Sequence, residues 1–253
     1  MGATLISSNR VTMDTLSDIQ IPNKTHSYVP VSHVDFIRNT KDIANRVLDK
    51  HQLHTEQYGI ARDGKQMFGT LTYKESFHDD PQDIGLSIGI RNSYDKSMSL
   101  GICSGASVFV CENLMMTGEV VAMRMHTGSI IDELKGLIFN ALLKAEDKFS
   151  TIHADSQQFK QHSLNDNTTA YNIMGRLYGY GVVTERQLPV MKREWQTPKH
   201  DAFKERTAWS LYNAGTECLK TTPPMHKMKR HIEMHNMFKN EFLLPRALAA
   251  GIA

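Results

Sequence analysis

The chain has 253 residues, of which 40% are hydrophobic and 22% charged, and its formal net charge at pH 7 is +2. This composition is typical of a folded globular protein and excludes an overall basic field that would by itself bind nucleic acid or a membrane. No uncharged run is long enough to span a bilayer, and the first residues lack the charged start and apolar core of a signal peptide. With only three cysteines, we expect a cytoplasmic protein without membrane contact.

The N-terminal region predicts an arm followed by a helix. Residues 1–24 show no sustained apolar period, so we expect a mobile arm there. Ser32, with Asp35 three residues later, has the pattern of a helix N-cap. Apolar residues at helical spacing then continue to about Leu48, which predicts a helix over this stretch.

A strand-rich region follows. Residues 56–61 and 67–73 flank Asp63 and Gly64, and an Asp-Gly pair between two such runs predicts a β-hairpin. In residues 84–90 large apolar side chains alternate with Gly or Ser, so one face of this strand is almost bare. A bare face fits close packing of another element or close approach of a ligand, and we favour packing. Further strands are expected at 98–102, 106–111 and 119–125, with a bulge or bend at Gly105.

The period changes to helical from Ser129 onwards. Ser129 and Asp132 form a second capping pair, and an apolar stripe runs from residue 130 to 149. Helices are also expected at 168–178, from Thr184, at 206–220 and from Pro224 to about residue 242. Strands segregated from helices predict an α+β fold. We expect an antiparallel sheet of about five or six strands packed by a long helix, within a core domain at 25–150. A mostly helical C-terminal part at 151–242 and a tail at 243–253 complete the chain.

The polar segment 91–97 is the strongest candidate for a binding site. Arg91 and Lys96 offer positive charge to phosphates, and Tyr94 offers a ring that can stack on a base. The alternative is a polar hairpin loop whose Asn, Ser and Asp side chains bond to their own backbone. Spacing alone favours this second interpretation.

A second candidate is the basic block at residues 226–231. Lys227, Lys229 and Arg230 lie on the last predicted helix and can contact a nucleic-acid backbone. A solvated helix face opposite a methionine stripe explains the same pattern, and we favour that explanation.

The sequence predicts neither a metal site nor a cofactor. The pairs His51/His54 and His231/His235 lack a third ligand at a recognisable spacing. Phosphate-binding loops, nucleophile elbows and dinucleotide motifs are absent from the sequence. No catalytic residue is assigned, and an enzyme is not the leading hypothesis.

Several segments nevertheless resemble one family. The likeness is carried by residues 88–119 (IGIRNSYDKSMSLGICSGASVFVCENLMMTGE), the following HT at 126–127, 28–30 (YVP), 63–69 (DGKQMFG) and, more weakly, 207–214. They resemble the phage/plasmid-like proteins grouped as domain of unknown function family 932, over most of residues 25–220. The resemblance implies a mobile-element origin in a bacterial host and carries over no catalytic or binding residue. The order of helix, strands and long helix is also similar to Rad-type single-strand annealing proteins, an analogy of architecture alone.

The leading hypothesis is therefore an oligomeric, non-enzymatic protein that binds single-stranded nucleic acid during recombination or replication. We assign its contacts to Arg91, Tyr94, Lys96, Lys227, Lys229 and Arg230. A first rival is an anti-defence protein or inhibitor that binds a host protein. A second rival is an enzyme whose site unites Arg91, Asn92, Asp95 and His126, and it requires these four side chains to converge in one pocket.

Overall fold

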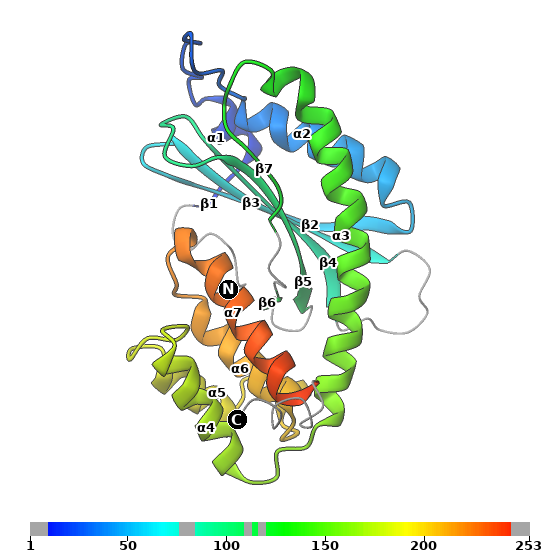
Figure 1. Cartoon of the computed structure of the whole chain (residues 1–253), viewed down its shortest axis with the longest axis vertical. Helices are drawn as coiled ribbons and strands as arrows, with labels where there is room; N and C mark the ends of the chain where they lie inside the picture. Colours follow the sequence, from blue (N-terminus) through cyan, green and yellow to red (C-terminus); the bar gives the residue numbers. More distant parts are fainter. Residues whose placement is uncertain (1–9, 76–83, 109–112, 116–119, 244–253) are drawn as a thin grey trace, which may run out of the picture.

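The computed structural model describes residues 10–75, 84–108, 113–115 and 120–243, and it has the expected α+β fold (Figure 1). In chain order its elements are β1 (Arg10–Val11), α1 (Met13–Ser17), α2 (His33–Val47), β2 (His51–Ala61), β3 (Gln66–Glu75), β4 (Ile84–Ser93), β5 (Leu100–Val108), β6 (Asn113–Met115), β7 (Val120–Arg124), α3 (Ile130–Gln161), α4 (Asn167–Gly179), α5 (Leu188–Gln196), the 3₁₀ helix η1 (Asp201–Phe203), α6 (Ala208–Leu219) and α7 (Pro224–Phe242).

The strands form one antiparallel sheet in the order β1-β2-β3-β4-β5-β6, and β7 pairs with β5 beside β6. The β2–β3 hairpin is confirmed, with Ala61 opposite Gln66. Its turn places Arg62, Asp63 and Gly64 at positive φ, where glycine carries no Cβ penalty. A Cβ at Gly64 would also lie 2.9 Å from the Ile19 side chain, so this turn packs too closely for a larger residue.

The sheet corrects two expectations. β5 pairs with β4 in an unbroken register across Gly105, so the bulge expected there is wrong. The irregularity lies instead between Ile102 and Cys103, where β5 pairs with β7. Arg91, Asn92 and Ser93 belong to β4 rather than to a loop, because each continues the pairing with β3.

Helices α2 and α3 cover one face of the sheet and build the first hydrophobic core (Figure 1). α2 begins as expected, because the Ser32 hydroxyl accepts the Asp35 backbone N–H at 3.2 Å. Its Phe36 and Ile37 pack with Leu71 and Ile88 of the sheet in this core. Ser129 is the N-cap residue of α3 but makes no capping hydrogen bond with its side chain.

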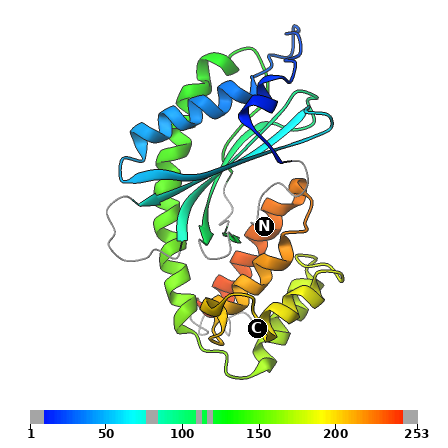
Figure 2. The same cartoon turned by 180° about the vertical axis from the view of Figure 1, so that it is seen from behind.

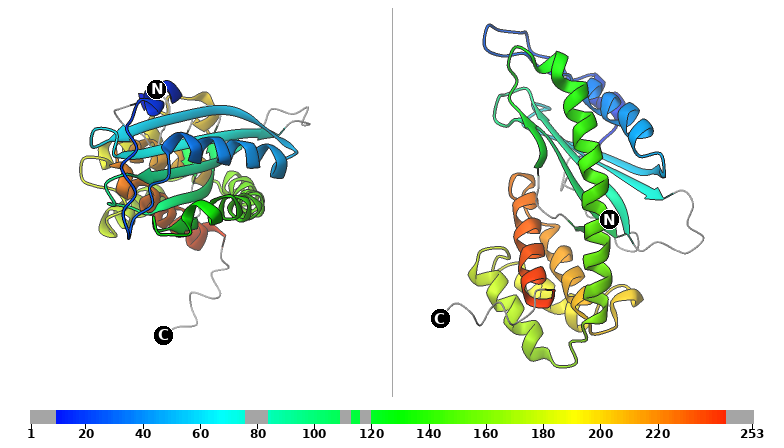
Figure 3. Two further views of the ribbon diagram at one scale, coloured as in Figure 1. Left: turned by 90° about the horizontal axis from the view of Figure 1, so that it is seen from above. Right: turned by 45° about the vertical axis from the view of Figure 1, so that its right-hand side comes forward.

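The C-terminal helices form a second core at the end of the molecule where β6 lies (Figures 1 and 2). Trp195, Tyr212 and Phe238 are buried in it, and the ends of β4 and β5 contribute Ile84 and Val108. α3 runs along the long axis and reaches both cores, as the second view in Figure 3 shows. It is longer than the stripe ending at residue 149 predicts, because Ile152 and Phe159 continue its buried side into the second core.

The expected arm is partly ordered. Residues 10–17 contain β1 and α1, and Leu16 is only 2% exposed. The Thr12 hydroxyl caps α1 by accepting the Thr15 N–H. Residues 1–9, the tail from 244 onwards and Cys111 lie outside the described residues.

Candidate functional site

The turn after β4 is held by its own hydrogen bonds. The Tyr94 backbone N–H donates to the Lys65 carbonyl at 2.7 Å, which ties this turn to the β2–β3 turn. Asp95 accepts the Ser97 backbone N–H at 3.0 Å and a hydrogen bond from the Arg62 guanidinium at 3.2 Å. These bonds fit the alternative interpretation of residues 91–97, a polar hairpin loop whose side chains bond to nearby backbone groups.

Tyr94 is buried within this arrangement and has no free face for a base. Its ring stacks on the His33 ring at 3.8 Å between centroids with planes 10° apart, and it is 8% exposed. Its hydroxyl accepts the His33 backbone N–H at 2.9 Å. The stacking role expected for Tyr94 therefore does not fit this structure, because the ring already braces the start of α2.

Arg91 lies on the other face of the sheet from its neighbour Asn92, because successive strand residues point to opposite faces. A Cβ at Gly101, its partner on β5, would lie 3.0 Å from the Arg91 Nε. Gly101 thus leaves the room that the arginine side chain occupies. Ile232 of α7 packs near Phe68, the Arg91 partner on β3, so α7 approaches this face of the sheet.

The basic block on α7 is less exposed than its sequence suggests. Lys227 is 2% exposed and donates from Nζ to the Lys220 carbonyl at 2.9 Å, and burial lowers its pKa to about 8. Arg230 is half-buried and donates to Gln187 at 3.2 Å. Only Lys229 of the three projects into solvent, 3.7 Å from Glu233. The phosphate-contact role expected for Lys227 therefore does not fit the structure.

The two histidines of the last helix, His231 and His235, are both buried. His235 lies 3.0 Å from Asp155 through Nε2 and 3.3 Å from the Tyr212 hydroxyl through Nδ1. Among the described residues no group of three His, Cys, Asp or Glu side chains has the arrangement of a metal site.

A buried polar cluster fastens the segment before α2 to β4. Asn92 donates from Nδ2 to the Val31 carbonyl at 2.7 Å and also lies 2.9 Å from the His33 Nδ1. His33 contacts the Gly64 carbonyl through Nε2 at 3.0 Å. Nδ1 then accepts and Nε2 donates, so the neutral ring is fully bonded. Burial lowers the pKa of His33 to about 4, although the Gly64 carbonyl opposes this shift.

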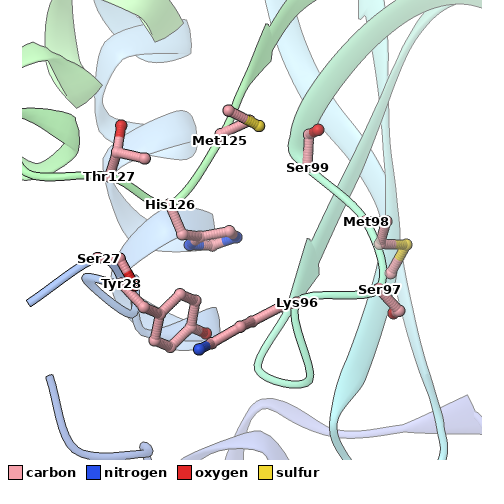
Figure 4. A pocket seen from close by; sticks show the side chains of 9 residues that line it. All are labelled: Ser27, Tyr28, Lys96, Ser97, Met98, Ser99, Met125, His126 and Thr127. Atoms are coloured by element: carbon pink, nitrogen blue, oxygen red, sulfur yellow. The ribbon is translucent and has the colours of Figure 1, made fainter. Parts of the chain in front are cut away.

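A pocket of about 330 Å³ opens beside this cluster, between the segment before α2, the β4–β5 connection and the end of β7 (Figure 4). Its lining residues are Ser27, Tyr28, Lys96, Ser97, Met98, Ser99, Met125, His126 and Thr127. Lys96 is exposed and holds its Nζ 4.9 Å from the centre of the Tyr28 ring. Of the four residues that the enzyme hypothesis requires, only His126 lines this pocket. The expected convergence of the four side chains in one pocket is therefore not found.

The C-terminal part has a surface that the sequence did not reveal. Tyr171, Tyr178 and Tyr180 are 37%, 48% and 73% exposed on and after α4. Lys192 of α5 lies over the Tyr171 ring at 5.9 Å, and Gln196 donates to the Tyr171 hydroxyl at 2.8 Å. The seven-residue spacing of Tyr171 and Tyr178 could have indicated a shared helix face, but exposure is visible only in the structure.

Charge is unevenly divided along the chain. Residues 151–253 contain 14 Lys and Arg against 9 Asp and Glu, a formal charge of +5, whereas residues 1–150 contain 15 against 18, or −3. The near-neutral total therefore conceals a basic C-terminal part that carries the exposed tyrosines.

The fold and these clusters define an α+β protein whose sheet and C-terminal helices share one long helix. A family model described as "Domain of unknown function (DUF932)" matches residues 23–240, and the chain belongs to this family. No curated protein and no solved structure matches the chain. Among the described residues no helix has the length and apolar content needed to cross a membrane.

Proposed function

We propose that the chain is an oligomeric protein of a phage or plasmid that binds single-stranded nucleic acid in recombination or replication. The observation that carries this proposal is the exposed tyrosine surface of α4 with Lys192 beside it. Exposed aromatic rings next to cations are the elements on which proteins stack unpaired bases while holding the phosphate backbone. The excess of positive charge in residues 151–253 supports the same partner.

The structure changes which residues we assign to this function. Tyr171 and Tyr178 replace the buried Tyr94 as stacking residues. Lys192 and Lys229 are exposed cations of this part, whereas Lys227 bonds to a carbonyl. Arg91, Lys96 and Arg230 remain candidate phosphate contacts.

Fluorescence anisotropy of a labelled oligothymidine tests this proposal. Tyr171→Ala and Tyr178→Ala should each weaken binding by about five- to a hundredfold, because one stacked base contributes roughly 1–3 kcal/mol. Tyr171→Phe keeps the ring and is the matched control, with near wild-type affinity expected. Binding should also weaken steeply as salt rises. Wild-type protein that binds neither single- nor double-stranded oligonucleotides at low salt would contradict the proposal.

Self-association has a candidate surface on α3. Phe139 and Leu143 are 47% and 44% exposed, one helical turn apart, and Ile131 near the start of the helix is 53% exposed. Large apolar side chains grouped on a surface helix are typical of protein contacts. We expect native mass spectrometry to show an oligomer that Phe139→Lys dissociates, whereas Lys144→Met on an exposed position of the same helix leaves it intact.

The same apolar stripe supports the alternative function, inhibition of a host-defence or other host protein. The alternative would be favoured if the protein is a monomer, binds no nucleic acid and, in a pull-down from host lysate, captures one host protein in an equal amount. Loss of the same host protein with Phe139→Lys would place its contact on α3.

A further inference from the structure

The pocket in Figure 4 has the lining of an anion site. None of its nine lining residues is acidic, while Lys96 supplies one ammonium and His126 one imidazole. Ser27, Ser97, Ser99 and Thr127 add four aliphatic hydroxyls, and Tyr28 adds a phenol whose O–H donates to the Ser93 carbonyl at 3.2 Å. Hydroxyl, imidazole and ammonium groups all donate hydrogen bonds, so the pocket is rich in donors. The Ser97 hydroxyl already donates to the Asp95 carboxylate, which leaves the other aliphatic hydroxyls for a ligand.

His126 is the feature of this pocket that the fold leaves unexplained. His126 is only 6% exposed, and neither ring nitrogen makes a hydrogen bond of good geometry. The ring points into the pocket beside Tyr28, at 5.5 Å between ring centroids (Figure 4). Its backbone carbonyl accepts the Val29 N–H at 3.0 Å, which fixes the position of the residue. Buried polar atoms in native proteins almost always have a partner, so these two nitrogens indicate a ligand group.

His126 and Lys96 offer different kinds of contact to a ligand in this pocket. Burial lowers the pKa of His126, and a contact of the ring with the Val29 backbone, too poorly aligned to count as a hydrogen bond, opposes this shift only in part. At neutral pH the ring is therefore uncharged and offers one N–H and one lone pair. The fixed positive charge of the pocket belongs to Lys96.

Lys96 reaches this position through an unusual backbone conformation. Its φ is +61°, in the left-handed region that residues with a Cβ seldom adopt. The Asp95 carboxylate holds the turn in place by accepting the Ser97 backbone N–H at 3.0 Å. A strained residue that projects a charged side chain into a pocket is the kind of outlier that accompanies ligand binding.

We propose that this pocket binds a phosphate monoester, with Lys96 as the charged partner and His126 as a neutral hydrogen-bond donor. Three terminal oxygens on one phosphorus can accept bonds from the ammonium, the imidazole N–H and the hydroxyls of Ser27, Ser99 and Thr127 together. A volume of about 330 Å³ leaves room for an organic group attached to the phosphate, against Met98 and Met125. A phosphorylated small molecule and the 5′-phosphate end of a nucleic-acid strand carry this same group.

Histidine side-chain NMR of the full chain tests the proposal directly. Titration with a deoxynucleoside 5′-monophosphate should shift the His126 ring nitrogens, and the unphosphorylated nucleoside should not. Lys96→Asn removes the ammonium while keeping a residue that tolerates positive φ, and it should weaken binding by about tenfold or more. His126→Gln should weaken it as well. His226→Gln and Lys144→Met, which alter exposed residues outside the pocket, are the matched controls.

Oligonucleotides with and without a 5′-phosphate separate the two sources of the group. A His126 shift with the phosphorylated strand alone assigns the strand end, and a shift with the mononucleotide alone assigns a small molecule. Tyr171→Ala should leave the His126 response unchanged, so failure of the tyrosine surface and failure of this pocket are distinguishable. Absence of a His126 shift with every phosphate compound, or equal affinity in Lys96→Asn that retains a wild-type circular dichroism spectrum, overturns the proposal.

Discussion

Beside each core lies a histidine bonded through both ring nitrogens, but the partners of the two histidines differ in charge. His33, beside the first core, is bonded to the Gly64 carbonyl and the Asn92 amide, which are neutral. His235, in the second part, lies between the Asp155 carboxylate and the Tyr212 hydroxyl. A neutral surrounding gives no compensation for a proton on the His33 ring, and burial lowers the pKa of this ring to about 4. Histidine thus holds one region together through bonds to neutral groups and the other through a bond to a carboxylate.

Acid should therefore weaken the first core before the second. The folded protein keeps His33 neutral down to its pKa of about 4, whereas the unfolded chain binds the proton near its ordinary pKa of 6.5. Protons thus favour the unfolded chain in this window, and the free energy of unfolding should fall by about 3 kcal/mol between these values. Urea denaturation followed by circular dichroism at several pH values measures this loss.

His33→Gln provides the control for the acid effect. Its amide can donate to the Gly64 carbonyl and accept from Asn92 without a titration, so its stability should vary less over the same pH window. Burial also lowers the pKa of His126, which adds to the wild-type loss in the same direction. If the free energy of unfolding of the wild type is equal at both ends of this pH window, the predicted acid effect of His33 is wrong.

The second core should respond to loss of its carboxylate. Burial acts to raise the pKa of Asp155, but hydrogen bonds from His235 and Lys239 outweigh it and hold this pKa below its usual value. The stability from this carboxylate is therefore present at neutral pH and is lost only as the pH falls through the acidic range. Asp155→Ala leaves His235 buried without its acceptor and should cost about 2 kcal/mol in urea denaturation at neutral pH.

Asp201→Ala is the matched control for this change. Asp201 has a 91% exposed side chain and pairs with Lys204, so the free energy of unfolding of this variant should equal the wild-type value. Equal destabilisation by Asp155→Ala and Asp201→Ala would show that the buried carboxylate contributes no more to stability than an exposed one.

The smallest effect concerns Tyr94. Tyr94→Phe keeps the ring stacked on His33 but removes the acceptor of the His33 backbone N–H, and it should cost about 1 kcal/mol. The variant should bind oligothymidine as the wild type does, in contrast to Tyr171→Ala. Thermal denaturation and anisotropy measure the two quantities. A large loss of DNA binding in Tyr94→Phe would restore the stacking role that its burial argues against.

Local chemistry made much of the fold predictable. Asp63-Gly64 indicated the hairpin because its turn requires positive φ, and Pro224 marked the start of α7 because proline fits a first helical turn. The length of α3 was missed because Asp155 and Ser156 interrupt its apolar stripe with buried polar residues. The partner that makes Asp155 acceptable there, His235, lies 80 residues away along the chain.

The candidate sites were less predictable for the same reason. Tyr94 was expected to face a ligand, but it stacks on His33, which no local pattern connects with it. The pocket joins three segments that are distant in sequence, so His126 at a strand end gave no sign of its unpartnered nitrogens. Sequence patterns report on bonds between near neighbours, whereas both clusters are made by contacts between distant ones.

The length of α3 has a consequence for how the molecule opens. Its 32 residues extend about 48 Å, and Phe149 in its second half packs against both cores. Backbone amides near Phe149 can exchange with deuterated solvent only when the helix unwinds, and unwinding there removes packing from both cores at once. These amides should therefore exchange as slowly as the whole chain unfolds, while the outer turns of α4 exchange sooner. The helix thus makes one cooperative unit of two cores that share few other residues.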